Sequence, residues 1–440
     1  MFTIVLVLLI LAAFVSMAKG KLEQEVAMPL AALATLVLVG LHDVLAGGDD
    51  AETALIEGFS QFARIAVLFT AVAVPAHLLQ RAGALNWLAM LVGEWLGRLI
   101  IRFKAAPFVV VPAVCLFLTF AMAALFHNTT SILVCAYITV LVCKSYQLRP
   151  LPVLIASLVA SNLGGFSTRW GDTPNIVEAV EWQLHHKDFF LEIMPVNIGL
   201  VAILAAVVSF LLWWGTPSIS ADSDQFETVK AFVSFRSARR TDGIDRRLFL
   251  IGFTGLAVAV VGPMIYPNSE IAISSLGILF CVLAERSSHR KDTLLALKIE
   301  TYVTLCAIFV LGRILAHSQI GVGNQIKVWL ESSGMSVWSI ATASYLGTLL
   351  TEAASWATAV SPIIQASDPT HVAAWALGAG VCSGSSSLVT AATAGIILTR
   401  ETKDNGPEAR VTFASYLLFG LTFSLVMLAY YIIVLSIIWH

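Results

Sequence analysis

Small polar residues interrupt four apolar stretches of this chain, and the interruptions come in two pairs. The first pair lies at residues 126–131 and 161–175, and the second lies at 350–355 and 382–395. Unwound backbone at membrane depth is tolerated only where it is buried in protein or lines a cavity. Broken helices in corresponding positions of two halves indicate the binding site of a secondary transporter.

The first pair offers oxygen ligands for a cation. Freed backbone carbonyls and the oxygens of Asn, Ser and Thr favour Na⁺, and glycine lets the backbone turn so that its carbonyls face a ligand. The predicted ligands are Asn128, Thr129, Thr130, Ser161, Asn162, Gly164 and Gly165. Within this set, Na⁺ is expected at Asn128, Thr129, Ser161 and Asn162.

Asp172 is the acidic residue of the first pair. An acid at membrane depth costs roughly 2.5–3.5 kcal/mol on insertion scales and is usually functional. One interpretation is a proton- or cation-binding carboxylate, and the other is an ion pair with Arg169 that locks the break. Arg169 could alternatively hold an anionic substrate bidentately.

Glu352, at the tip of the second hairpin, is the other predicted intramembrane acid. Two carboxylates in opposite halves fit the exchange of protons for a cation, whereas a protonated Glu352 could simply hydrogen-bond to backbone. His127 could titrate near neutral pH or could satisfy a structural hydrogen bond.

Hydroxyl residues fill the second break, where Ser385, Ser386 and Thr390 are the predicted ligands. Small residues also let membrane helices approach closely, so ordinary packing is the alternative.

Composition fixes the class of protein that must position these residues. Of the 440 residues, 58% are hydrophobic and 12% are charged, against roughly a quarter charged in soluble domains. An all-α polytopic membrane protein is expected, in contact with lipid and a small ion. A formal net charge of −2 gives no indication of nucleic acid. We find no phosphate loop, zinc-protease motif or nucleophile elbow, so no enzyme and no cofactor beyond Na⁺ or H⁺ is expected.

Apolar runs long enough to span about 30 Å of hydrocarbon, and the positive charges between them, predict the topology. The runs lie near 2–17, 27–46, 62–79, 191–214, 248–265, 272–285, 302–316 and 413–438. The basic segments 215–247 and 286–298 flank a pair of spans and are expected to be cytoplasmic, with both termini outside. The segments near 106–144 and 335–367 then become re-entrant hairpins; two ordinary spans joined by a turn are the alternative. An interfacial helix is predicted before each hairpin, at 85–104 and 323–332.

These elements form an inverted repeat of about five spans each, with two re-entrant hairpins and two broken helices. The first repeat is 1–214, with its broken span at about 149–183. A cytoplasmic linker covers 215–246. The second repeat is 247–440, with its broken span at about 371–400.

The first-half motifs resemble those of the ion transporter superfamily, which includes citrate-transporter-like permeases, divalent anion/sodium symporters, arsenite permeases and sodium/proton antiporters. The motifs are Asn128-Thr129-Thr130, Ser161-Asn162-Leu163-Gly164-Gly165 and Gly171-Asp172-Thr173-Pro174-Asn175. The resemblance implies a dimerisation scaffold, hence a homodimer, and a mobile transport part, and it adds Asn175 to the site. Family symporters carry Ser-Asn-Thr at both hairpin tips, whereas the second tip here is Thr351-Glu352-Ala353. The pattern is most similar to the sodium/proton antiporter branch.

A Na⁺(cation)/H⁺ antiporter working by alternating access is therefore the first functional hypothesis. An ion-coupled carrier of a small anion such as citrate, a dicarboxylate or arsenite is the alternative, with Arg169 at its site. A channel or a non-transporting membrane protein is a third. The compact build without long extramembrane domains fits a bacterial inner membrane.

Overall fold

The chain is helical, without strands, throughout the residues that the computed structural model describes. These are all residues except 1, 20, 23, 127, 170, 216–220, 242, 267–268, 291–292, 294–298, 317–322, 351–352 and 439–440. Six of the described helices are long and apolar enough to cross a membrane, and several shorter apolar helices accompany them. The prediction of an all-α polytopic membrane protein is confirmed.

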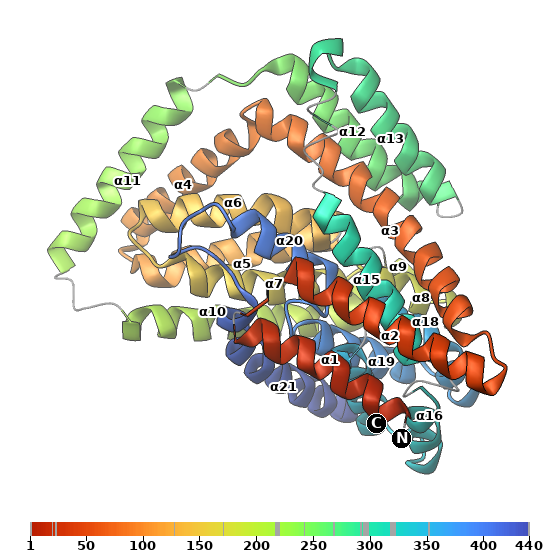
Figure 1. Cartoon of the computed structure of the whole chain (residues 1–440). Coiled ribbons are helices and arrows are strands. Elements are labelled where there is room, and N and C mark those ends of the chain that lie inside the picture. The colour runs from red at the N-terminus through yellow and green to blue at the C-terminus, as the bar shows by residue number, and fades with distance from the viewer. Residues whose placement is uncertain are drawn as a thin grey trace.

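One group of helices is organised around the long helix α3 (Asp50–Arg81). At one end α3 packs against α12 (Arg246–Ile265) and α13 (Glu270–Ala284), as the upper right of Figure 1 shows. It also packs against α2 (Gln24–Ala46) and α15 (Ile299–Ala316), and α1 (Phe2–Ala18) packs on α2. A short 3₁₀ helix, Ser287–His289, follows α13.

The interrupted segments form two series of four helices. The first series is α5 (Pro107–Phe126), α6 (Asn128–Ser145), α7 (Pro150–Phe166) and α8 (Thr173–Glu181). The second is α17 (Val337–Leu350), α18 (Ala353–Ser367), α19 (His371–Ser385) and α20 (Thr393–Thr402). The chain leaves helical geometry between α7 and α8 and between α19 and α20, where both broken helices were predicted.

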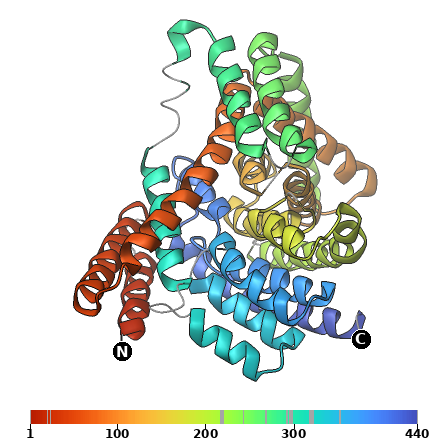
Figure 2. The same ribbon diagram turned by 90° about the vertical axis from the view of Figure 1, so that its right-hand side faces the viewer.

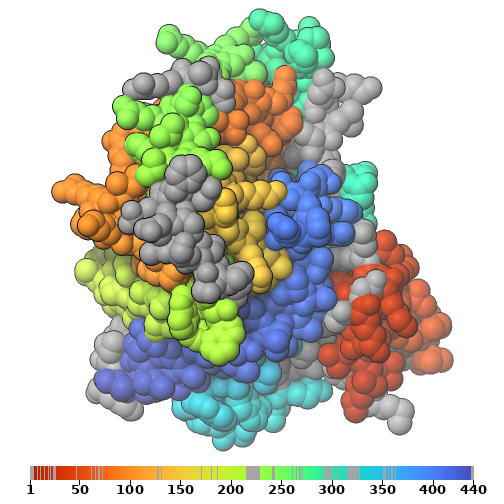
Figure 3. Space-filling view, turned by 90° about the vertical axis from the view of Figure 1, so that its left-hand side faces the viewer, coloured from red at the N-terminus to blue at the C-terminus, as the bar shows by residue number. Residues whose placement is uncertain are grey.

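The two series pack in matching ways. Helix α5 packs on α7, as α17 packs on α19; the short helix α8 packs on α18, as α20 packs on α6. In Figure 3 the blue segment near residue 400 lies against the gold segment of α6, and the Lys144 ammonium donates to the Asn405 carbonyl there. Each short helix therefore contacts the hairpin of the other series.

A long helix completes each series. Short α9 (His186–Asp188) and a π-helical turn (Phe189–Ile193) lead into α10 (Met194–Gly215), which packs on α5 and α7. Helix α21 (Phe413–Ile438) packs on α17 and α19 in the same way. Figure 2 shows the cyan and blue helices of the second series gathered below the yellow helices of the first.

Glycine allows the closest helix contacts within each series. A Cβ atom at Gly164 of α7 would lie 2.2 Å from the Phe120 carbonyl oxygen of α5. A Cβ atom at Gly384 of α19 would lie 2.8 Å from the Tyr345 carbonyl oxygen of α17. Only a residue without a side chain fits at these two points, as small residues do where membrane helices cross.

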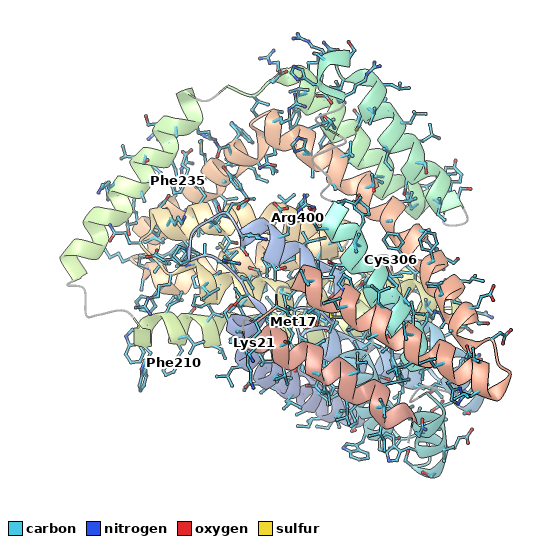
Figure 4. All side chains as sticks on the ribbon, in the orientation of Figure 1. Met17, Lys21, Phe210, Phe235, Cys306 and Arg400 are labelled. Carbon is cyan, nitrogen blue, oxygen red and sulfur yellow. The ribbon has the colours of Figure 1, made fainter. Side chains whose placement is uncertain are left out.

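The segment predicted as a linker, 215–246, contains a helix that the charge pattern did not reveal. Helix α11 (Ala221–Thr241) lies along α4 (Ala84–Phe103), the helix predicted at 85–104. Figure 4 labels Phe235 on α11; its ring covers Gly93 of α4 and stacks on Tyr146, with 6.0 Å between ring centroids. Buried Glu94 pairs with Arg98 and with Arg239, whose Nε lies 2.9 Å away. The other predicted interfacial helix is α16 (Gly323–Ser332).

Candidate functional site

The first hairpin tip and the first helix break meet at Asp172. Asp172 is the N-cap residue of α8, and its Oδ1 accepts a hydrogen bond from the Thr173 amide at 2.8 Å. The Asn128 side chain at the start of α6 lies beside this carboxyl group, since both residues border Gly165. The backbone N–H of Asn128 donates a hydrogen bond to the Gly171 carbonyl oxygen at 3.0 Å. Asp172 of the first break and Asn128 of the first hairpin tip, which come from separate segments of the sequence, therefore lie together.

Two buried amide oxygens at this junction have no hydrogen-bond partner among the described residues. They are Oδ1 of Asn128 and Oδ1 of Asn162. A Cβ atom at Gly165 would lie 3.4 Å from the Asn128 Cβ and 3.3 Å from the Asp172 Cβ, and Asn162 lies about one turn before Gly165 on α7. An unsatisfied buried acceptor costs about 1–3 kcal/mol and calls for an explanation such as a bound ion.

Several predicted ligands of the first half instead hold the shape of the break. The Asn175 amide group donates to the carbonyls of Gly165, at 2.7 Å, and Thr168, at 2.8 Å. The Ser161 hydroxyl bonds back to the Leu158 carbonyl of its own helix. Gly164 lies directly against the backbone of α5 at Phe120. These residues fix the backbone beside the unpaired oxygens.

Ser386 connects the second break to the first. Its hydroxyl accepts a hydrogen bond from the Asn162 amide nitrogen at 3.1 Å and donates to the Cys382 carbonyl. The Tyr416 hydroxyl donates to the Ser386 carbonyl at 2.6 Å. Ser385 bonds to the Cys382 carbonyl, whereas the buried hydroxyl of Thr390 has no partner among the described residues. Of the three predicted ligands here, Ser386 contacts the first break directly and Thr390 keeps an oxygen available.

Arg169 is partly exposed beside the first break and does not form an ion pair with Asp172. The interpretation in which this pair locks the break is therefore not what the structure shows. Thr129 is partly buried next to Asn128. Three predicted groups lie outside the described residues: His127, Glu352 and the side chain of Thr130.

Asn197 supports the site and was missed by the sequence analysis. It is fully buried on α10, and its amide group donates to the Leu163 carbonyl at 3.1 Å and to the Ser167 hydroxyl at 2.9 Å. Its Oδ1 accepts a hydrogen bond from the Tyr431 hydroxyl of α21. The available signal was an asparagine within the apolar run 191–214.

Glu178 is the second missed residue. It lies on α8, six residues after Asp172, and is fully buried with neither carboxyl oxygen hydrogen-bonded to any described residue. A Cβ atom at Gly378 of α19 would lie 2.6 Å from its Oε2, so the carboxyl group rests against the α19 backbone. The available signal was a second acid in the predicted broken span 149–183.

Comparisons with known proteins agree with this architecture. The family model described as "Citrate transporter" matches residues 3–395. The magnetosome protein MamN of Magnetospirillum gryphiswaldense is 26% identical over 361 residues, covering 76% of this chain and 75% of its own. A 46 kDa membrane protein of Mycobacterium leprae is 25% identical, covering 64% and 67%. An uncharacterized transporter of Mycobacterium tuberculosis is also 25% identical, covering 70% and 67%.

Proposed function

The chain belongs to the citrate transporter family, and we propose that this integral membrane transporter binds a cation between Asn128, Asn162 and Asp172 and exchanges it for protons. Na⁺ is the leading cation, because the oxygens available are amide, hydroxyl and carboxylate oxygens. Hard cations prefer such oxygen ligands, and unwound helix ends in transporters supply further carbonyls.

The observation that carries this proposal is the pair of unpaired buried oxygens, Oδ1 of Asn128 and Oδ1 of Asn162. An amide group on the surface would satisfy its oxygen with water, but these two belong to buried residues, and Asn128 lies beside the Asp172 carboxylate. A cation would supply the missing partner for both and would compensate the charge of Asp172. The residues present therefore fit a monovalent cation.

Alternating access by two inverted repeats completes the proposal. The matching contacts of α5 with α7 and α17 with α19, and of α8 with α18 and α20 with α6, support two equivalent halves joined at the site. We place the repeats at 1–214 and 247–440, in a homodimer. Bacterial relatives favour a plasma-membrane location, and the basic loops favour external termini.

The test is proton movement in proteoliposomes that contain a pH-sensitive dye. Na⁺, Li⁺ and K⁺ are added in turn under an imposed pH gradient, with protein-free vesicles as the control. Na⁺- or Li⁺-induced dissipation of the gradient supports antiport. No response to any of the three cations contradicts it.

A carrier of a small carboxylate anion is the second candidate, and two observations favour it. The family model is described as a citrate transporter, and Arg169 has no ion-pair partner among the described residues at the first break. A guanidinium group binds a carboxylate through two parallel hydrogen bonds. Uptake of labelled citrate that is lost in Arg169→Gln and retained in Arg149→Gln would establish this candidate. Absence of uptake for citrate, dicarboxylates and arsenite would exclude it.

A further inference from the structure

We propose that Glu178 is the proton-binding site of this transporter, and that it holds its proton in the conformation described here. The inference rests on the proposed cation/proton exchange and assigns the proton to a residue outside the cation site. The cation site uses Asn128, Asn162 and Asp172, whereas the Glu178 carboxyl group lies against Gly378 of α19.

The surroundings of Glu178 favour the neutral carboxylic acid. The side chain is fully buried, and neither oxygen has a hydrogen-bond or ion-pair partner among the described residues. Gly378 lies against Oε2, and the Phe166 ring fills the same space, since a Cβ atom at Gly378 would lie 2.3 Å from that ring. An ionised carboxylate is strongly disfavoured in such a place, and a protonated one is tolerated.

Neither α18 nor α19, the described helices that pack on α8, contains a lysine or an arginine. Helix α8 packs on α18, which has no titratable residue, and on α19. On α19 the titratable groups are Cys382, which interacts electrostatically with Glu178, and His371, which lies two turns before Gly378 and 3.9 Å from Glu192. On its own helix the interacting charge is Asp172. Asp172 is therefore the charged group that acts on Glu178, and it repels a second negative charge.

The interaction with Asp172 links proton and cation. When the cation site is empty, the charge of Asp172 repels a second negative charge at Glu178. A cation bound at Asp172 compensates that charge and removes the repulsion. Loss of the proton from the Glu178 hydroxyl then requires only that water reach the carboxyl group, and the carboxylate remains behind.

The contact with Gly378 is where water can gain access. Glu178 belongs to the first series of helices and Gly378 to the second, so the carboxyl group lies on the boundary between them. Movement of α8 relative to α19 would uncover Glu178 on one side of the membrane. The cation would thus bind at Asp172 and the proton would leave from Glu178, so the two ions would not compete for one carboxylate.

The test compares Glu178→Gln with Glu178→Asp and with Glu181→Gln. Glu181 lies on the same helix but is partly exposed, so it is a matched control. In proteoliposomes, Glu178→Gln should lower Na⁺-induced proton flux about tenfold or more while Na⁺/Na⁺ exchange stays within about twofold. Glu178→Asp and Glu181→Gln should retain both activities.

Unchanged proton flux in Glu178→Gln would overturn the proposal, and so would equal loss of Na⁺/Na⁺ exchange in Glu178→Gln and Glu178→Asp. If the wild-type protein moves no cation, the proposed function fails, and infrared spectroscopy still tests this site. The C=O stretch of a protonated carboxyl group should be present at neutral pH and absent in Glu178→Gln. Its persistence in that variant would show that the proton lies elsewhere.

Discussion

The Asn162 amide nitrogen donates a hydrogen bond to the Ser386 hydroxyl 3.1 Å away, and this contact joins the two broken helices at their breaks. Asn162 lies on α7 and Ser386 directly follows α19. One amide group thus offers its nitrogen to the other half of the molecule and its oxygen to the proposed cation. The two roles can be separated by mutation.

Asn162→Ala should lower cation-induced proton flux about tenfold or more, because it removes a ligand oxygen to a charged group. Ser386→Ala should have a smaller effect, since Oδ1 of Asn162 remains. Ser157→Ala, which alters a buried hydroxyl bonded only to its own helix, is the control. An equal loss in Ser386→Ala would show that the link between the breaks matters more than the oxygen. Dye-based flux in proteoliposomes measures all three.

Asp172→Asn should abolish cation-induced proton flux while the protein remains folded. Asparagine caps a helix about as well as aspartate, so the hydrogen bond from Thr173 is kept and only the charge is lost. Thermal unfolding in detergent should change little. Asp188→Asn, which changes another carboxylate that accepts a backbone hydrogen bond, should leave flux unchanged. Normal flux in Asp172→Asn would remove the carboxylate from the proposed site.

Gly164→Ala should destabilise the protein by about 1–3 kcal/mol, because a methyl group has no room beside the Phe120 carbonyl. The melting temperature in detergent should fall, and Gly384→Ala should behave alike. Gly40→Ala is the control, since no atom lies within 4 Å of the added Cβ. A melting temperature that is unchanged in Gly164→Ala would contradict the close contact of α5 and α7.

Phe235→Ala should loosen α11 from α4. Phe235 is buried between Gly93 and Tyr146, and truncation of a buried Phe to Ala costs about 3–5 kcal/mol. Hydrogen–deuterium exchange of the α11 amides should become faster, whereas exchange in α12 should not change. Val233→Ala, at an exposed position of α11, is the control. Equal exchange rates in the two variants would show that the ring does not hold the helix.

The positions of the membrane helices and of both breaks could be predicted from the sequence, because apolar runs and the Gly, Ser and Asn residues that interrupt them are local signals. Asn128 and Asp172 were assigned to one site from separate segments, and the structure brings them together. The helix α11 was missed because the positive charges that indicate the side of the membrane say nothing about helicity. Its buried residues Thr228, Ala231 and Phe235, together with the half-buried Phe232, do follow helical spacing.

The residues that surround and support the site could not be assigned from the sequence in the same way. Asn197 acts through contacts with α7 and α21, which are distant in the chain. Glu178 is unusual because α19, which follows it by some two hundred residues along the chain, lies against its carboxyl group and leaves both oxygens buried and unpaired among the described residues. Asn175 matched a ligand motif, yet its side-chain nitrogen donates to the carbonyls of Gly165 and Thr168 within the break. Such roles depend on tertiary contacts rather than on local pattern.

The glycine contacts at Gly164 and Gly384 also limit how this molecule can deform. Where helix backbones touch, there is no layer of side chains that could change rotamer and let one helix slide along the other. Helices α5 and α7 are therefore expected to move as one rigid pair, and α17 and α19 as another. Bending must then occur between the two pairs, where the Phe166 ring packs on Trp375 and Asn162 hydrogen-bonds to Ser386.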